Sequence, residues 1–88
     1  MAYTPDIAST LHDRQQTYGE YPRLAELSQN LKSLVRTHPG WTRMNGAQRE
    51  ALEMILHKIA RIVNGDPDYR DSWDDIAGYA ARGTERTQ

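Results

Sequence analysis

Acidic side chains at helical spacing are the clearest candidates for chemistry in this chain of 88 residues. Glu50 and Glu53 stand three residues apart in one helical segment, and Asp71, Asp74 and Asp75 open the next. A hard cation such as Mg²⁺ is held by a few oxygens from neighbouring elements, so these carboxylates are candidate ligands. The alternative is a pair of amphipathic helices whose charges form solvated outer faces.

The elements that must position these residues are helices, because apolar residues recur at steps of three and four along most of the chain. Asn45 followed by Gln48 has the pattern of a capping box, and Asp71 is a candidate N-cap for the last helix. No segment alternates like a strand. We therefore expect an all-α fold, a small four-helix bundle forming a single domain over residues 1–88, with helices at about 6–17, 22–36, 46–64 and 72–81 and a frayed tail at 83–88.

The helix at 46–64 has the clearest two-sided pattern. At 100° per residue its apolar residues form one face, and its polar residues lie opposite. The predicted apolar face consists of Leu52, Ile55, Ile59, Ile62 and Val63, and the polar face of Glu50, Glu53, His57 and Arg61.

Composition excludes several classes of protein. There is no cysteine, so disulfides and thiolate chemistry are absent. The net charge of −1 gives no electrostatic case for nucleic acid, and no apolar run is long enough for a membrane span. His12, His38 and His57 lack the spacing of zinc ligands. We expect a cytoplasmic protein, and the small size favours a homo-oligomer that completes or stabilises the core.

Two blocks of the sequence resemble a family of small uncharacterised proteins common in bacteriophages and prophages. The first is Arg-x-x-x-Tyr-Gly at residues 14–19. The second runs from Glu53 to Ala80 and contains Lys-Ile-Ala-Arg-Ile, Asn-Gly-Asp-Pro and Asp-Ser-Trp-x-Asp-Ile-Ala-Gly-Tyr-Ala. This resemblance implies a phage or prophage origin, and hence the host cytoplasm.

A more distant resemblance is to the MazG-like all-α nucleotide pyrophosphohydrolases, which carry Glu-x-x-Glu on one helix and Glu-x-x-Asp on the next. Glu50-Ala-Leu-Glu53 matches the first element. The second is approximated by Asp71-Ser-Trp-Asp74 or by Asp71 with Asp75, and if Asp75 takes the aspartate position, Ser72 stands where the family has its second glutamate. The resemblance implies Mg²⁺ held by Glu50, Glu53, Asp71 and Asp75, and hydrolysis between the α- and β-phosphates of a nucleoside triphosphate.

In that activity, the substrate-binding residues would be Lys58, Arg61 and Tyr79. Lys58 and Arg61 would contact phosphate oxygens, and Tyr18, Trp41 or Tyr79 would stack on the base. His57 could assist proton transfer. No catalytic residue is assigned.

Geometry also supports a structural explanation of the same charges. In an antiparallel hairpin Arg61 lies level with Asp74 and Asp75, and can pair with one of them, while Glu53 lies on the order of 12 Å further from the turn. Gly78 on a polar helix face suggests that a helix or ligand approaches closely, because glycine is costly there.

We therefore expect a nucleotide-binding protein, with Mg²⁺-dependent pyrophosphohydrolysis as its possible activity. The alternative is a non-catalytic phage protein that binds a host protein or a nucleotide signal.

Overall fold

The computed structural model describes the backbone of residues 3–85 and the side chains of residues 7–85. It confirms the all-α fold, and no strand occurs within this part of the chain. The elements are α1 (Tyr3–Tyr18), α2 (Tyr21–Arg36), a short 3₁₀ helix η1 (Pro39–Arg43), α3 (Gly46–Asn64) and α4 (Arg70–Arg82). Of the tail predicted to fray, residues 86–88 lie outside the described residues.

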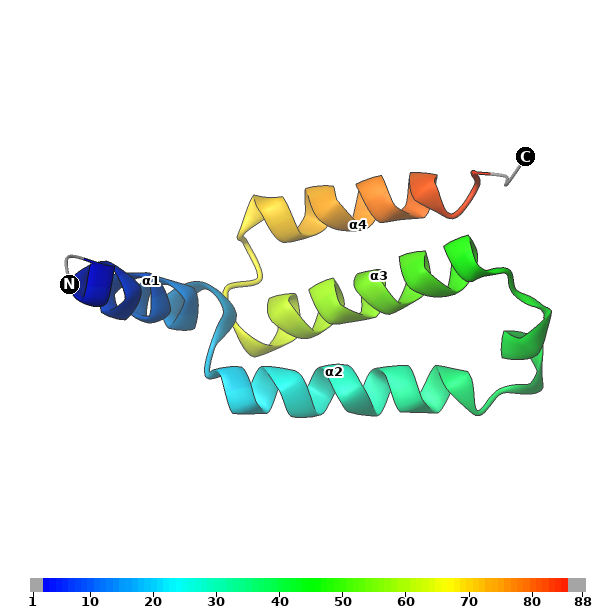
Figure 1. The fold of residues 1–88 in the computed structure, drawn as a ribbon, viewed down its shortest axis with the longest axis horizontal. Coiled ribbons are helices and arrows are strands. Elements are labelled where there is room, and N and C mark those ends of the chain that lie inside the picture. Colours follow the sequence, from blue (N-terminus) through cyan, green and yellow to red (C-terminus); the bar gives the residue numbers. More distant parts are fainter. Residues whose placement is uncertain (1–2, 86–88) are drawn as a thin grey trace.

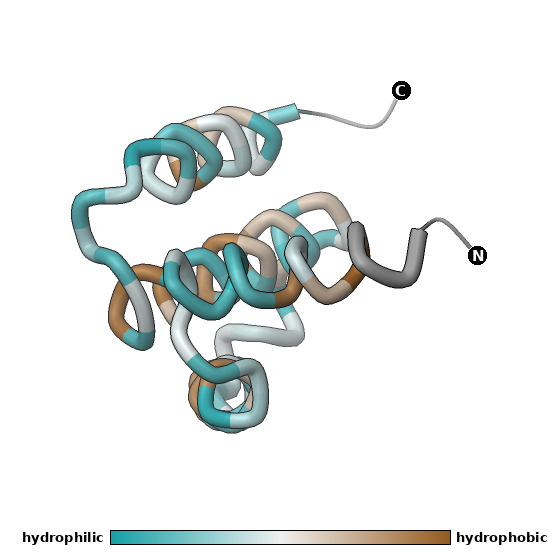
Figure 2. The backbone as a smooth tube through the Cα atoms, turned by 90° about the vertical axis from the view of Figure 1, so that its left-hand side faces the viewer, coloured by the Kyte–Doolittle hydropathy of each residue, from teal (hydrophilic) through white to brown (hydrophobic). Residues whose placement is uncertain are grey.

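Helix α3 is the centre of the molecule. It runs antiparallel to α2 on one side and to α4 on the other, and it packs most extensively against α4 (Figure 1). Helix α1 projects beyond one end of these three helices and crosses them at a steep angle (Figure 2). The molecule is consequently elongated, with extents of 47 × 28 × 28 Å.

The sequence signals for helix ends are confirmed at α3 and wrong at α4. Asn45 Oδ1 accepts a hydrogen bond from the Gln48 backbone N–H at 2.8 Å, and Gln48 Oε1 accepts from the Asn45 N–H at 3.0 Å, which completes the capping box. At α4 the N-cap position is Tyr69, not Asp71. The Asp71 carboxylate instead accepts a hydrogen bond from the Tyr69 hydroxyl at 3.1 Å.

The predicted inner face of α3 is wrong in part. Val63 is 69% exposed and Leu52 39% exposed, whereas Lys58 and Ala60 are buried. The reason is that α3 has neighbours on two sides, so its buried positions are those that face α2 and α4. Within the apolar stripe Ile62 is buried, whereas Leu52 and Val63 lie at its other edge and stay exposed.

Two glycines attach α1 to the end of α3. Gly19 has φ of +80°, which only glycine adopts at little cost, and Gly65 lies against the backbone of Thr17 and Tyr18. The Asp66 N–H donates to the Thr17 carbonyl oxygen at 2.6 Å. A Cβ on Gly65 would overlap Thr17 and Tyr18, so glycine is required for this contact.

The close approach of a helix predicted at Gly78 is wrong, and that of a ligand stays a prediction. A Cβ at this position would meet no atom within 4 Å among the described residues.

Candidate functional site

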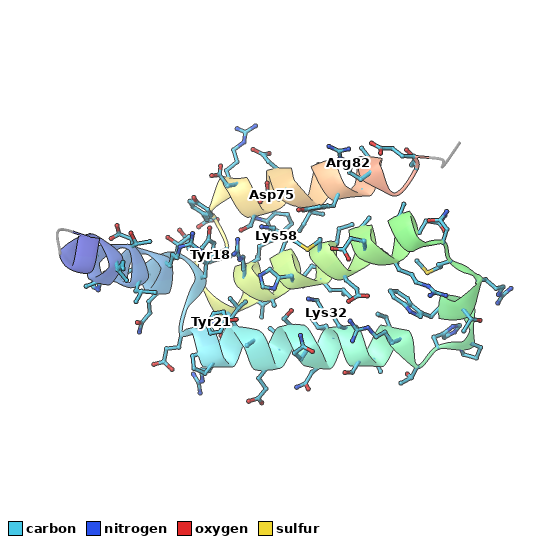
Figure 3. All side chains as sticks on the ribbon, viewed as in Figure 1. Tyr18, Tyr21, Lys32, Lys58, Asp75 and Arg82 are labelled. Atoms are coloured by element: carbon cyan, nitrogen blue, oxygen red, sulfur yellow. The ribbon has the colours of Figure 1, made fainter. Side chains whose placement is uncertain are left out.

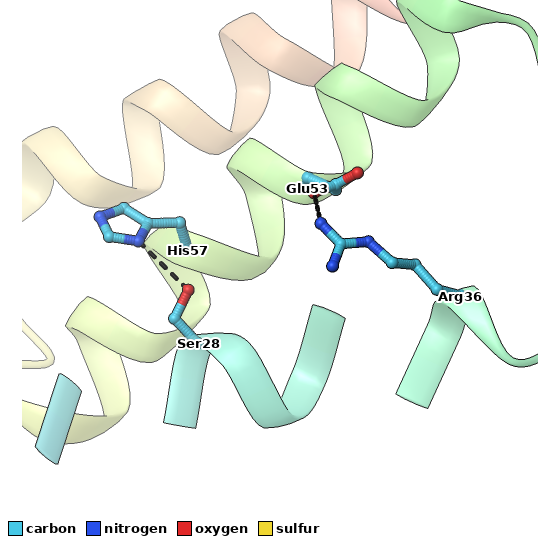
Figure 4. Close-up of polar contacts among 4 residues, drawn as sticks. All are labelled: Ser28, Arg36, Glu53 and His57. Carbon is cyan, nitrogen blue, oxygen red and sulfur yellow. Dashed lines mark hydrogen bonds and ion pairs between the residues drawn. The ribbon is translucent and has the colours of Figure 1, made fainter. Parts of the chain in front are cut away.

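Two of the four predicted metal ligands are engaged in ion pairs. Glu53 pairs with Arg36 of α2 (Figure 4). Asp75 points from α4 toward Lys58 of α3, at 3.1 Å between the Asp75 Oδ2 and the Lys58 Nζ (Figure 3). These two carboxylates therefore lie on opposite sides of α3.

The other two do not join them. Glu50 is exposed on α3, and Asp71 is exposed on α4 next to Tyr69. Within the described residues, no group of three or more histidine, aspartate or glutamate side chains lies close enough to hold a metal ion. One chain as described thus provides no four-carboxylate cluster, and the magnesium site stays a prediction.

The predicted pairing of Arg61 with α4 is wrong. Asp75 pairs with Lys58, and Asp74 pairs within its own helix with Arg70 at 3.4 Å. Lys58 is 8% exposed, so its ammonium group is buried beside the carboxylate that neutralises it. Arg61 is left to face α1.

A groove lies where α1 meets the start of α2 and the C-terminal half of α3. Its volume is about 1020 Å³. Its walls combine apolar, aromatic and basic side chains with a single acidic one. They include Ile7, Leu11, Arg14, Tyr18, Glu20, Tyr21, Leu24, His57 and Arg61.

Arg61 occupies the floor of this groove. Its guanidinium carbon lies 4.3 Å from the centre of the Tyr18 ring, which is the geometry of a cation–π contact. The Arg61 Nε is buried and makes no hydrogen bond to any described residue. Buried donors are normally satisfied, so the guanidinium has hydrogen-bonding capacity that the described chain does not use.

His57 lies one helical turn before Arg61. Its Nδ1 is 3.3 Å from the Ser28 hydroxyl oxygen (Figure 4). Burial, followed by the positive charges of Arg61, Lys32 and Lys58, lowers the pKa of His57 from its ordinary value of 6.5. The imidazole is therefore neutral at pH 7, and able to donate or accept one hydrogen bond in the groove.

Tyr79, the third predicted substrate-binding residue, lies elsewhere. It lines a separate, smaller hollow of about 380 Å³ between α3 and α4, together with Met44 and Leu52. The structure therefore brings neither Tyr79 nor Lys58 into the groove with Arg61.

Sequence reasoning missed Arg14 as a groove residue. A signal for it was present, because Arg14 and Tyr18 stand four apart, which places both on one face of a helix. The position of Tyr21 depends on how the chain turns at Gly19.

The described helices include none that is both long and apolar enough to cross a membrane. Comparison with curated proteins and with solved structures finds no significant match. A family model described as "Domain of unknown function (DUF6378)" matches residues 7–87. This match covers α1 from Ile7 onward and all of α2, α3 and α4, including every described residue that lines the groove, and the chain therefore belongs to the DUF6378 family.

Proposed function

We propose that this chain binds a nucleotide in the groove beneath α1. The observation that carries the proposal is the Arg61 guanidinium, which lines the groove and is stacked on Tyr18. Phosphate oxygens are the natural acceptors for such a group, because a guanidinium makes paired, charge-assisted hydrogen bonds to them.

The charge of the groove suits a phosphate chain. Arg14 and Arg61 line it, and the neighbouring Lys32 adds to the positive potential sensed by His57. Among the described residues that line it, Glu20 is the only acidic one. A single negative charge among these cations leaves the groove attractive to an anion.

The remaining walls suit a base and a sugar. Tyr18 and Tyr21 offer aromatic faces, and base–aromatic stacking is worth about 1–3 kcal/mol per base. The volume of about 1020 Å³ is at the upper end of the roughly 300–1,000 Å³ typical of ligand pockets. A nucleotide therefore fits by size as well as by chemistry.

Mg²⁺-dependent pyrophosphohydrolysis is the catalytic form of this proposal. It is supported by the resemblance of Glu50-Ala-Leu-Glu53 to the MazG-like motif and by the position of Glu53 four residues before His57. Since the four predicted carboxylates do not converge in the described chain, we derive no metal-dependent step. The alternative is a phage-encoded protein that binds a nucleotide signal, or a host protein, without turnover.

The test is isothermal titration with a panel of ribo- and deoxynucleoside triphosphates, with Mg²⁺ and again with EDTA. We expect binding to the wild type, and a loss of about tenfold or more in affinity for Arg14→Gln or Arg61→Gln, because a charge-assisted hydrogen bond contributes about 1.5–3 kcal/mol. Arg43→Gln, an equal charge change at an exposed position on η1, is the control and should bind normally.

Pyrophosphate release from the same samples separates the two forms of the proposal. Turnover that EDTA abolishes supports the hydrolase, and Glu53→Gln should then stop turnover without weakening binding. Binding without turnover supports the non-catalytic alternative. If the folded wild type binds no nucleotide, or if Arg14→Gln and Arg61→Gln bind as well as Arg43→Gln, the groove is not a nucleotide site.

A further inference from the structure

Lys32 on α2 and Lys58 on α3 are the only lysines of the chain, and their surroundings differ. Lys58 is neutralised by Asp75. Lys32 is half-buried, yet it makes no ion pair with any residue whose side chain the structure describes. Partial burial removes water from a charged group and is unfavourable unless a counter-charge replaces that water. Lys32 is therefore suited to bind an anionic ligand.

The register of α2 directs Lys32 toward α3. Ser28, Lys32 and Arg36 follow one another at four-residue steps, so they share one face of the helix. The first and the last of them contact α3, Ser28 through His57 and Arg36 through Glu53. Lys32 lies between these two contacts, and Figure 3 shows it on the side of α2 that faces α3.

The position of Lys32 continues the line of the groove. Along α3, Arg61 and His57 both line the groove and lie about 6 Å apart along the helix axis. His57 is level with Ser28, and Lys32 lies about 6 Å beyond Ser28 in the same direction, because the two helices are antiparallel. Lys32 is thus on the order of 12 Å from Arg61 along the boundary between α2 and α3, just past the His57 end of the groove.

The carboxylates nearest to this boundary are already paired. Glu53 is held by Arg36, and on the other side of α3 the positive charge of Lys58 is matched by Asp75. The charges that act on His57 are those of Arg61, Lys32 and Lys58, and all three are positive. With Lys58 neutralised, Arg61 and Lys32 remain as two cations with a neutral imidazole between them.

We propose that Lys32 binds the terminal phosphate of a nucleotide whose first phosphate lies at Arg61, so that the groove selects nucleoside di- and triphosphates over monophosphates. The inference rests on the proposed function, since it takes Arg61 as the first phosphate contact. An ammonium group offers three donors to phosphate oxygens. The Ser28 hydroxyl donates to the Nδ1 of His57, and the imidazole then presents its Nε2–H to the phosphates in between.

A chain of phosphates matches this arrangement better than a single anion does. One phosphate bound at Arg61 leaves Lys32 unneutralised, because the two side chains start about two helical turns apart. Each further phosphate extends the ligand along the boundary and adds negative charge next to the remaining cation. Affinity should therefore rise with the number of phosphates, and the rise should depend on Lys32.

Isothermal titration with adenosine mono-, di- and triphosphate in EDTA tests the inference without turnover. We expect the wild type to bind the triphosphate about tenfold or more tightly than the monophosphate. Lys32→Gln should remove most of this ratio and leave monophosphate affinity within about twofold, whereas Arg61→Gln should weaken all three nucleotides. Arg23→Gln is the matched control, since it removes one positive charge from an exposed position on the same helix, and it should keep the wild-type ratio. Circular dichroism checks that every variant is folded.

Two results would overturn the inference and leave the proposed function standing. One is equal affinity of the wild type for mono- and triphosphate. The other is a Lys32→Gln variant that keeps the wild-type ratio, or that loses affinity equally for all three nucleotides.

Inorganic tripolyphosphate separates the failure of the inference from that of the proposed function, because it carries phosphates and no base. If no adenosine nucleotide binds but tripolyphosphate does, and Lys32→Gln weakens it about tenfold, the phosphate subsite is supported and the nucleotide proposal is not. If the folded wild type binds neither adenosine nucleotides nor tripolyphosphate, the inference is overturned together with the binding of these nucleotides.

Discussion

Lys58 and Arg61 stand three residues apart on α3, yet the two sides of the helix use them differently. Lys58 is buried against α4, where Asp75 neutralises it at 3.1 Å. Arg61 lies under α1, where it meets the ring of Tyr18 and no carboxylate. A buried cation with a matched partner is a structural element, whereas a cation with an unused donor beside an open groove is a candidate binding residue.

The role of each cation therefore depends on the helix that packs against it and not on its residue type. Helix α4 presents acidic side chains to α3, and α1 presents an aromatic ring and Arg14. The predicted pairing of Arg61 with α4 was therefore wrong. The opposite charges are present, but Arg61 faces α1 and not α4.

The largest expected effect comes from Gly65→Ala, which should separate α1 from α3 and so take away the surroundings of Arg61. The new Cβ would overlap the backbone of Thr17 and Tyr18, and backbone atoms cannot move aside as a flexible side chain does. We expect the free energy of unfolding in urea to fall by about 3 kcal/mol, and nucleotide affinity to fall with it as α1 separates from α3.

Gly78→Ala is the control for that variant. It lies inside α4, where a Cβ meets nothing within 4 Å among the described residues, so the protein should gain about 0.5–1 kcal/mol. If Gly65→Ala were as stable as Gly78→Ala, the attachment of α1 to α3 described above would be incorrect.

The next largest loss of stability is expected on breaking the ion pair between Lys58 and Asp75. Asp75→Asn leaves the buried ammonium without its counter-charge and should lower the free energy of unfolding by about 2 kcal/mol. The double variant Lys58→Met with Asp75→Asn should recover much of this loss, because no charge then remains buried.

Asp74→Asn provides the comparison for Asp75→Asn. It breaks an exposed pair with Arg70, whose side chains are 86% and 61% exposed, and should change stability by about 0–1 kcal/mol. Urea titration of all four proteins gives the ranking. Equal losses for Asp74→Asn and Asp75→Asn would mean that the Lys58 pair is no more important than a surface pair.

The smallest expected effect is the pH dependence caused by His57. Its pKa in the folded protein lies below the ordinary value of 6.5, chiefly through burial and then through the charges of Arg61, Lys32 and Lys58. Between 6.5 and that lower pKa the unfolded chain binds more protons, so the free energy of unfolding falls as the pH is lowered through this window. Above 6.5 the residue contributes no pH dependence.

His57→Gln should therefore flatten the curve of unfolding free energy against pH below 6.5. A wild-type slope in His57→Gln would show that other groups, and not this imidazole, cause the dependence.

Much of the local structure followed from the sequence. The capping box at Asn45 and Gln48 and the helix at 46–64 are confirmed, since backbone hydrogen bonds, caps and glycine conformations depend on residues only a few positions apart. The helix ends differ by a few residues at α1 and α4, and at α4 the N-cap residue, Tyr69, makes no side-chain capping hydrogen bond.

The site was less predictable. Of the three predicted substrate-binding residues, Arg61 lines the groove, whereas Lys58 and Tyr79 do not; the three were grouped only because they share neighbouring helices. Four-residue spacing specifies which residues share a face, and it carries no information about which element covers that face.

By itself, then, the sequence determined that this protein is a small set of helices with charged and apolar stripes, because those features arise from short-range backbone geometry. Only the tertiary structure decided that α1 lies across the end of α3, that Lys58 is neutralised while Arg61 lies against Tyr18, and that Leu34, Leu52, Val63 and Trp73 stay exposed. Those outcomes depend on contacts between residues distant along the chain, such as Gly65 with Thr17, whose geometry no local pattern encodes.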